Sequence, residues 1–381
     1  MESRLASLDG LRGVAALVVV VHHLTLLSAA RFAIFSADAV PPPPGSVLWW
    51  LEGTPLVLTV VGGEAVFVFF VLSGFVVTRP ALAPGFDWLA YYPRRVLRLV
   101  LPVVGSVALA VVVILLTPQD PSTATSEWAR GSLIEDLDPR LALSATEVLF
   151  GDISINNPLW TLRWELLFSL LLPVYVVIVL ALRRWWPLGM LGCLAVLVVS
   201  WIVPNPAWRF LPMFLLGAFL AVALPALQAR LAARPITGGA HLLWALGLAL
   251  ALLALAARWL LWPVTAGTPF VTSIPGVISI AGATMVVVIA TLWPPVVRLL
   301  STAVFGWLGR ISFSLYLVHV PLLLGVVAFF PGSPWYVPAA VAFPVVLIGA
   351  ELFARFVEIP AHRFSRYVGR RASTLVARST P

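Results

Sequence analysis

Charged residues are scarce in this chain of 381 residues, since Asp, Glu, Lys and Arg together make up only 10% of it. Hydrophobic residues make up 61%, and the mean hydropathy is +1.02. No soluble fold could hide so much apolar surface from water, so the composition excludes a soluble globular protein. It predicts a membrane protein with several spans.

Lysine is absent, and all 24 basic residues are arginine. They stand singly or in pairs between apolar segments, so there is no basic domain and nucleic acid is not an expected partner. Cys193 is the single cysteine, which excludes a disulfide framework or a thiolate metal site within this chain. The histidines and acids lack the short spacing of metal ligands, and no GxxxxGK phosphate loop is present. A metal-dependent or ATP-driven mechanism is therefore not expected.

Ten apolar runs have roughly the 20-residue length of a membrane span. They cover residues 13–30, 56–78, 99–117, 159–182, 187–203, 210–226, 240–262, 274–293, 311–330 and 337–357. If the N-terminus is inside, eighteen of the 24 arginines lie in inner segments. Arg163 lies within a span, and the outer segments hold the other five, which are Arg31, Arg130, Arg140, Arg209 and Arg258. This asymmetry predicts an all-α bundle of about ten spans with both termini cytoplasmic.

Other interpretations apply to some of these segments. Residues 1–30 also fit a cleaved signal peptide, because Arg4 precedes an apolar run and small residues follow it. A histidine pair inside the apolar region fits that interpretation poorly. Two outer segments are long: residues 31–55 include a run of four prolines, and residues 118–157 are acidic. The second is either a lid or a solvated connector.

The segment SLDGLRGVAALVVVVHHL, residues 7–24, places ionisable groups in an expected span, where they are costly and usually functional. Arg12 and His23 are eleven residues apart, so on a helix they lie within ~20° of one face and ~16 Å apart. A neutral imidazole at His23 would serve as a base, although a lone histidine on an apolar helix is also often a hydrogen-bonded core residue. His22 points ~100° away from the Arg12 face.

The segment YYPRRVLRLVLP, residues 91–102, carries a second cluster. Arg95 and Arg98 are three residues apart and share a helix face, which suits contacts to phosphate oxygens. Juxtamembrane arginines also commonly anchor to lipid head groups.

Two glutamates interrupt expected spans. Glu64 follows two glycines in GGEAVFVFFVLSGF, and Glu165 lies in NPLWTLRWELLFSLLLP, on the outer half of its span. Each is either a catalytic or acceptor-binding group or half of a structural ion pair, and Arg163 and Arg209 are the expected partners of Glu165.

The segment GRISFSLYLVHVPLL, residues 309–323, places Ser312, Tyr316 and His319 at spacings of four and three. They form one polar stripe, which either contributes to a site or packs against other helices. Pro321 frees backbone groups nearby.

Together these segments resemble the integral-membrane acyltransferase 3 family over nearly the whole chain. LDGLRG with a histidine eleven residues after the arginine, RRVLR, FFVLSGF, PLWTLRWELLF and GRISFSLYLVHVPLL match in the family's order, and VEIPAHRF at residues 357–364 resembles its closing segment. Glu64 stands where many members have aspartate, and Arg163 and Trp164 stand where many have small residues.

The resemblance implies one membrane domain over residues 1–381, with residues 358–381 as a basic cytoplasmic tail, in a multi-pass protein of the bacterial plasma membrane. It implies transfer of an acyl group, most simply acetyl, from acyl-CoA as co-substrate to a hydroxyl of a carbohydrate or glycoconjugate, with no permanently bound cofactor. It makes His23, Glu165 and Glu64 the candidate catalytic residues. Arg12, Arg95 and Arg98 become the donor-binding arginines, and Ser312, Tyr316 and His319 further site residues.

The residues leave several alternatives open. His23 either removes the proton of the acceptor hydroxyl or takes the acyl group itself, and Tyr316 or Ser312 would stabilise the oxyanion. The acceptor is alternatively a small metabolite such as a macrolide. The rival from another class is a proton-coupled transporter in which the glutamates and histidines relay protons, and a noncatalytic scaffold is a third possibility. No repeat of broken helices supports a transporter.

Overall fold

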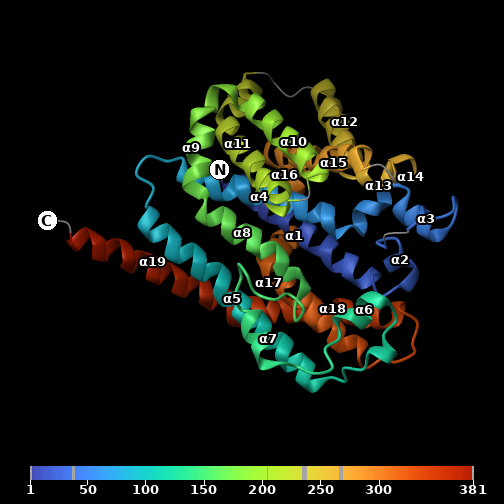
Figure 1. Ribbon diagram of the computed structural model, residues 1–381. Helices are drawn as coiled ribbons and strands as arrows, with labels where there is room; N and C mark the ends of the chain where they lie inside the picture. The colour runs from blue at the N-terminus through green and yellow to red at the C-terminus, as the bar shows by residue number, and fades with distance from the viewer. Residues whose placement is uncertain (1, 37–38, 204, 234–237, 266–268, 380–381) are drawn as a thin grey trace. The chain divides into compact units, whose positions relative to one another are not determined.

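Every regular element that the computed structural model describes is a helix (Figure 1), as the sequence predicts. The described residues are 2–36, 39–203, 205–233, 238–265 and 269–379. The predicted inner residue Arg234 and the last two residues of the predicted tail lie outside them. The helices in these ranges that are long and apolar enough to cross a membrane indicate a multi-pass membrane protein.

Eight helices among the described residues meet that requirement. They are Ala6–Thr25 of α1 (Glu2–Thr25), α4 (Gly62–Ala81), α5 (Trp88–Leu116), α11 (Pro206–Ala232), α12 (Gly238–Leu255), Ser273–Leu292 of α15 (Pro269–Leu292), α17 (Ala303–Val327) and a continuous stretch Tyr336–Leu375. A pair separated by a break at Leu171, α8 (Trp160–Leu170) and α9 (Leu172–Ala181), makes a ninth if it is one span. The remaining predicted span, 187–203, coincides with α10 (Trp186–Ile202), which has 17 residues.

The chain divides into two compact units, and among the described helices α1 and α17 contribute to both. Unit 1 holds residues 1–19, 40–84 and 171–309, and unit 2 holds residues 20–39, 85–170 and 310–381. The break at Leu171 falls at one of these divisions.

In unit 1, α4 packs along α11 and against α15, while α10 packs on α11 and α12 on α15. The α4–α11 contact depends on two glycines. A Cβ at Gly74 would lie 2.0 Å from the Phe214 carbonyl oxygen, and a Cβ at Gly217 would lie 2.0 Å from the Val71 carbonyl oxygen. The two backbones touch there, which is how helices pack closely when no hydrophobic effect drives them together.

Unit 2 is built around α5, which packs along α19 (Ile359–Ser379), with α8, α17 and α18 (Tyr336–Phe353) (Figure 1). The expected outer segment 118–157 contains the short helices α6 (Glu127–Ser132) and α7 (Pro139–Ser144), and α6 packs on α2 (Ala29–Ala33). A π-helical turn, Ala354–Glu358, joins α18 to α19. The predicted tail from residue 358 is therefore helical as far as Ser379.

Candidate functional site

The predicted polar stripe on α17 lies in unit 2 and is buried: Ser312, Tyr316 and His319 are 1%, 7% and 1% exposed. Pro321 lacks the N–H that would bond to the carbonyl four residues earlier, so the Leu317 carbonyl has no partner within the helix. The side-chain amide of Asn156 donates to that carbonyl at 2.8 Å. Asn156 is fully buried, and it therefore ties the segment before α8 to the helix that carries the stripe.

His319 and His23 form the centre of the candidate site. Nδ1 of His319 lies 3.0 Å from the Leu315 carbonyl oxygen, and its Nε2 lies 3.2 Å from Nδ1 of His23. A carbonyl only accepts hydrogen bonds, so we assign the proton of neutral His319 to Nδ1. Nε2 of His319 then accepts from Nδ1–H of His23. This assignment leaves the basic lone pair of His23 on Nε2.

The hydroxyl of Tyr316 belongs to a separate set of hydrogen bonds. It donates to the Pro158 carbonyl at 3.1 Å, and it accepts from the Thr161 hydroxyl at 2.8 Å. Its ring lies 5.8 Å from that of His319. Because its proton is used by Pro158, Tyr316 in this arrangement supports the histidine through packing and has no second proton to offer an oxyanion.

Aromatic rings contact His23 and its neighbour His22. The Trp128 ring of α6 lies 5.5 Å from the His23 ring at 52°, and the His22 ring makes an edge contact with Phe35 at 5.6 Å. The guanidinium of buried Arg31 lies 4.9 Å from the Phe35 ring. Sequence reasoning missed Trp128, because a tryptophan in an acidic connector carries no signal of its partner.

Arg95 and Glu165 form an ion pair between α5 and α8, and their side chains are 13% and 16% exposed. Nε of Arg95 also donates to the Ser169 hydroxyl at 2.9 Å, and this hydroxyl donates to the Glu165 carbonyl at 2.6 Å. The partner expected for Glu165 was Arg163 or Arg209. The guanidinium of Arg163 instead donates to the Gly151 carbonyl at 3.3 Å.

The end of α8 explains this pairing. Pro173 lacks the N–H that would bond to the Ser169 carbonyl, and α8 ends at Leu170. The Tyr91 hydroxyl of α5 donates to the Ser169 carbonyl at 3.1 Å. The first turn of α5 therefore covers the last turn of α8, which brings Arg95 level with Glu165.

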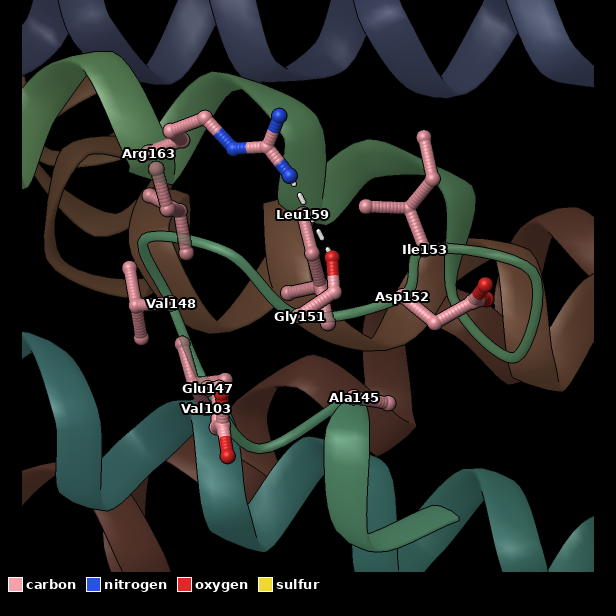
Figure 2. Close-up of a pocket in the computed structure, with 10 residues that line it drawn as sticks. Val103, Ala145, Glu147, Val148, Gly151, Asp152, Ile153, Leu159 and Arg163 are labelled. Atoms are coloured by element: carbon pink, nitrogen blue, oxygen red, sulfur yellow. Dashed lines mark hydrogen bonds between the residues drawn. The ribbon is translucent and has the colours of Figure 1, made fainter. Parts of the chain in front are cut away.

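Arg163 lines a small cavity beside Glu147, Gly151 and Asp152 (Figure 2). Its volume is about 10 Å³, which is roughly the space of one water molecule. Two hydrogen bonds from Ser154 lower the pKa of Asp152; the larger effect comes from the Ser154 hydroxyl and the smaller from its backbone N–H. This carboxylate is therefore ionised at neutral pH. The cavity is too small for an acyl donor or a sugar.

The π-helical turn before α19 buries a carboxylate. The Ser314 hydroxyl of α17 donates to Glu358 at 2.5 Å, and Nε2 of His362 lies 3.7 Å from the other oxygen of Glu358. Arg98, the second arginine of the predicted pair, is exposed on α5. The sequence motif at residues 357–364 did not predict the partners of Glu358 or His362.

Two predicted site residues, Arg12 and Glu64, lie in unit 1. A nitrogen of Arg12 lies 3.9 Å from Asp9 on α1. Glu64 is buried in the first turn of α4, where the helix dipole favours an anion, and it accepts a hydrogen bond from the Trp259 indole at 2.9 Å. The structure thus brings His23 together with His319 and Arg95 together with Glu165, while Arg12 and Glu64 have their own partners.

The arrangement in unit 2 places the polarised imidazole of His23 in a largely apolar site. Such an imidazole can act as a general base or as a nucleophile. Comparison with curated proteins and with solved structures found no match. Comparison with family profiles matched residues 5–354 to the one described as "Acyltransferase domain". Because the match covers nearly the whole chain, this protein belongs to the integral-membrane acyltransferase 3 family.

Proposed function

We propose that this protein is an O-acyltransferase of the bacterial plasma membrane that moves an acyl group, most simply acetyl, from acyl-CoA to a hydroxyl of a carbohydrate or glycoconjugate. Membership of an acyltransferase family supports the reaction class. The observation that carries the proposal is the chain of contacts from the Leu315 carbonyl through His319 to His23.

In the proposed reaction, Nε2 of His23 accepts the proton of the acceptor hydroxyl as its oxygen attacks the thioester carbonyl. A C–O bond forms and the C–S bond breaks, and the proton on His23 passes to the departing thiolate to give CoA. His319 acts as a positioning residue, because its Nε2 holds Nδ1–H of His23 and so fixes the orientation of the ring. The alternative, in which His23 first takes the acyl group, uses the same lone pair.

Arg95 and Glu165 have a shared role in this scheme. Because Glu165 and Ser169 hold the guanidinium of Arg95, its remaining donors are oriented rather than mobile. We assign Arg95 to the donor side together with Arg98, and Glu165 to the positioning of Arg95. Arg12 and Glu64 remain predicted donor and acceptor residues, and Trp128 covers one side of His23.

The test is an acyl-transfer assay with the full chain, purified in detergent and reconstituted in nanodiscs. Acetyl-CoA carrying a labelled acetyl group is incubated with a panel of sugars and hydroxylated metabolites, and both free CoA and labelled product are measured. We expect the wild type to consume the thioester and to label the acceptor, and His23→Ala to do neither. His22→Ala is the matched control and should behave like the wild type. Proton-coupled solute uptake without any acylation would overturn the proposal in favour of the transporter.

A further inference from the structure

Helices α9, α10 and α11 pack together in unit 1, and the short turn Arg183–Trp185 joins α9 to α10 (Figure 1). Between them lies an open groove of about 470 Å³, which we call the α10 groove. This volume falls within the range of ~300–1,000 Å³ that is typical of small-ligand sites. Among the described residues that line it, the side chains are hydrocarbon apart from the Trp185 indole and the Cys193 thiol. The α10 groove therefore suits a hydrocarbon ligand and has few groups that would orient a sugar.

The α10 groove exists because α10 presents glycine to it. Gly189 and Gly192 both line the groove, and the ring of Phe219 on α11 fills the space at Gly189, where a Cβ would lie 2.3 Å from the ring. At Gly192, no atom outside its own helical turn lies within 4 Å of a Cβ. The buried side chains of Phe219 and Cys193 close the bottom of the groove. The space beside Gly192 is therefore free for a ligand.

The length of the α10 groove matches one leaflet of a bilayer. Trp185 and Val196 both line it, and eleven residues of helix rise by ~16 Å. One leaflet contributes half of the ~30 Å hydrocarbon core of a membrane. Trp185 is 62% exposed, and tryptophan is enriched where the membrane meets water. The groove thus follows the course of a lipid acyl chain, from the interface at Trp185 toward the midplane of the bilayer.

Positive charge marks the interfacial end of the groove. Arg183 and Arg184 directly precede Trp185, and both are exposed. Within the part of the chain that the structure describes, no acidic side chain forms an ion pair with either arginine. Arginines at the level of the lipid head groups attract anionic lipids, and their guanidinium groups bind phosphate oxygens in pairs. The charge therefore selects a lipid whose head group is negative.

We propose that the α10 groove binds one acyl chain of an anionic phospholipid, with Arg183 and Arg184 holding the phosphate of its head group. The chain lies beside Gly192 and over Phe219, and the head group stays at the interface. All of these residues belong to unit 1, whereas His23 and His319 belong to unit 2. The lipid site is therefore additional to the candidate catalytic site, and its test does not depend on acyl transfer.

The first experiment measures head-group selectivity by native mass spectrometry of the full chain in detergent. The chain is titrated with phosphatidylglycerol and with phosphatidylcholine that carries the same acyl chains. The double variant Arg183→Gln/Arg184→Gln should bind phosphatidylglycerol roughly thirtyfold more weakly, since each arginine near the membrane surface strengthens attraction to an anionic lipid roughly fivefold. Its affinity for phosphatidylcholine should not change. The control is Arg298→Gln, which removes an exposed arginine of α16 (Pro294–Leu300).

The second experiment locates the acyl chain. Phosphatidylglycerol with a diazirine midway along one chain is photolysed with the full chain, and crosslinked peptides are identified by mass spectrometry. The wild type should crosslink on α10 and α11, and Gly192→Leu, which fills the groove, should lower that yield roughly tenfold. Gly247→Leu is the matched control, because Gly247 of α12 has equally open space for a Cβ. It should crosslink like the wild type.

Three results would overturn the proposal. The first is equal phosphatidylglycerol affinity in the wild type and in the double arginine variant, which decides the matter even if Gly192→Leu does not fold. The second is an unchanged crosslink yield on α10 and α11 in folded Gly192→Leu. The third is a wild-type dimer that Gly192→Leu dissociates while lipid crosslinks are absent from α10 and α11, because the occupant is then a second copy of the chain.

Discussion

Nδ1 of His23 and Nε2 of His319 lie 3.2 Å apart, and the Leu315 carbonyl on the far side of His319 decides which nitrogen of each ring carries the proton. One backbone oxygen thus sets the tautomer of a residue on another helix. The consequence is that the two histidines should fail differently when each is replaced.

His23→Ala should abolish transfer. His319→Ala should lower kcat roughly 100-fold and leave the KM for the acyl donor almost unchanged. General-base catalysis contributes a rate factor of about 10²–10⁴, and this variant loses only the orientation of the His23 ring. Steady-state kinetics on the nanodisc sample measure both values. His22→Ala should retain most activity, since that ring makes edge contacts with His23 and Phe35 but is not part of the contacts from the Leu315 carbonyl through His319 to His23. Equal kcat in wild type and His319→Ala would remove His319 from the mechanism.

The ion pair between Arg95 and Glu165 should stabilise the fold as well as orient the arginine. Arg95→Gln and Glu165→Gln should each cost about 3 kcal/mol of unfolding free energy, with a coupling energy of about 1–3 kcal/mol in the double-mutant cycle. Reversible unfolding in mixed micelles provides the measurement. The matched control is the pair Arg355 and Glu351, whose arginine is 65% exposed, and whose coupling should be about 0.5 kcal/mol or less. Similar coupling in the two pairs would contradict the prediction.

Asn156→Ala should cost about 1–3 kcal/mol of unfolding free energy, because it leaves the Leu317 carbonyl buried without its donor. In a Pro321→Ala background the cost should be much smaller, since residue 321 then supplies the N–H that the helix lacked. The same unfolding assay compares the four forms. If Asn156→Ala costs as much in both backgrounds, the hydrogen bond to Leu317 is not the source of its stability.

Trp128→Ala should raise hydrolysis of acyl-CoA relative to transfer, because removing the indole from the His23 ring admits water to the base. The ratio of free acetate to acylated product is the quantity to measure. Phe150→Ala is the control, because Phe150 lies in the same connecting segment and is 86% exposed. An unchanged ratio in Trp128→Ala would show that the indole does not exclude water from His23.

Sequence reasoning predicted the all-helical fold, the family and the region of most spans, because each depends on apolar length and on motifs close together in the chain. It placed Arg95 at the membrane entrance and Glu165 on the outer half of a straight span, and so proposed the wrong partners for Glu165. The error comes from Pro173. It leaves the Ser169 carbonyl at the end of α8 without a donor from its own helix, and Tyr91 of α5 donates to that carbonyl, which brings Arg95 beside Glu165. The partners of Ser314 and Leu317 could not be predicted either, since they lie 44 and 161 residues away.

Two prolines, Pro173 and Pro321, each deprive a carbonyl of its own helix partner, and in both cases a side chain from another segment replaces it: Tyr91 for Ser169 and Asn156 for Leu317. A lone α8 or α17 released into lipid would expose an unsatisfied oxygen to hydrocarbon, which costs several kcal/mol. Tyr91 and Asn156 both precede, in the chain, the helices to which they donate. Each donor is therefore already synthesised when α8 or α17 emerges, and each helix should enter the bilayer against the earlier segment rather than alone.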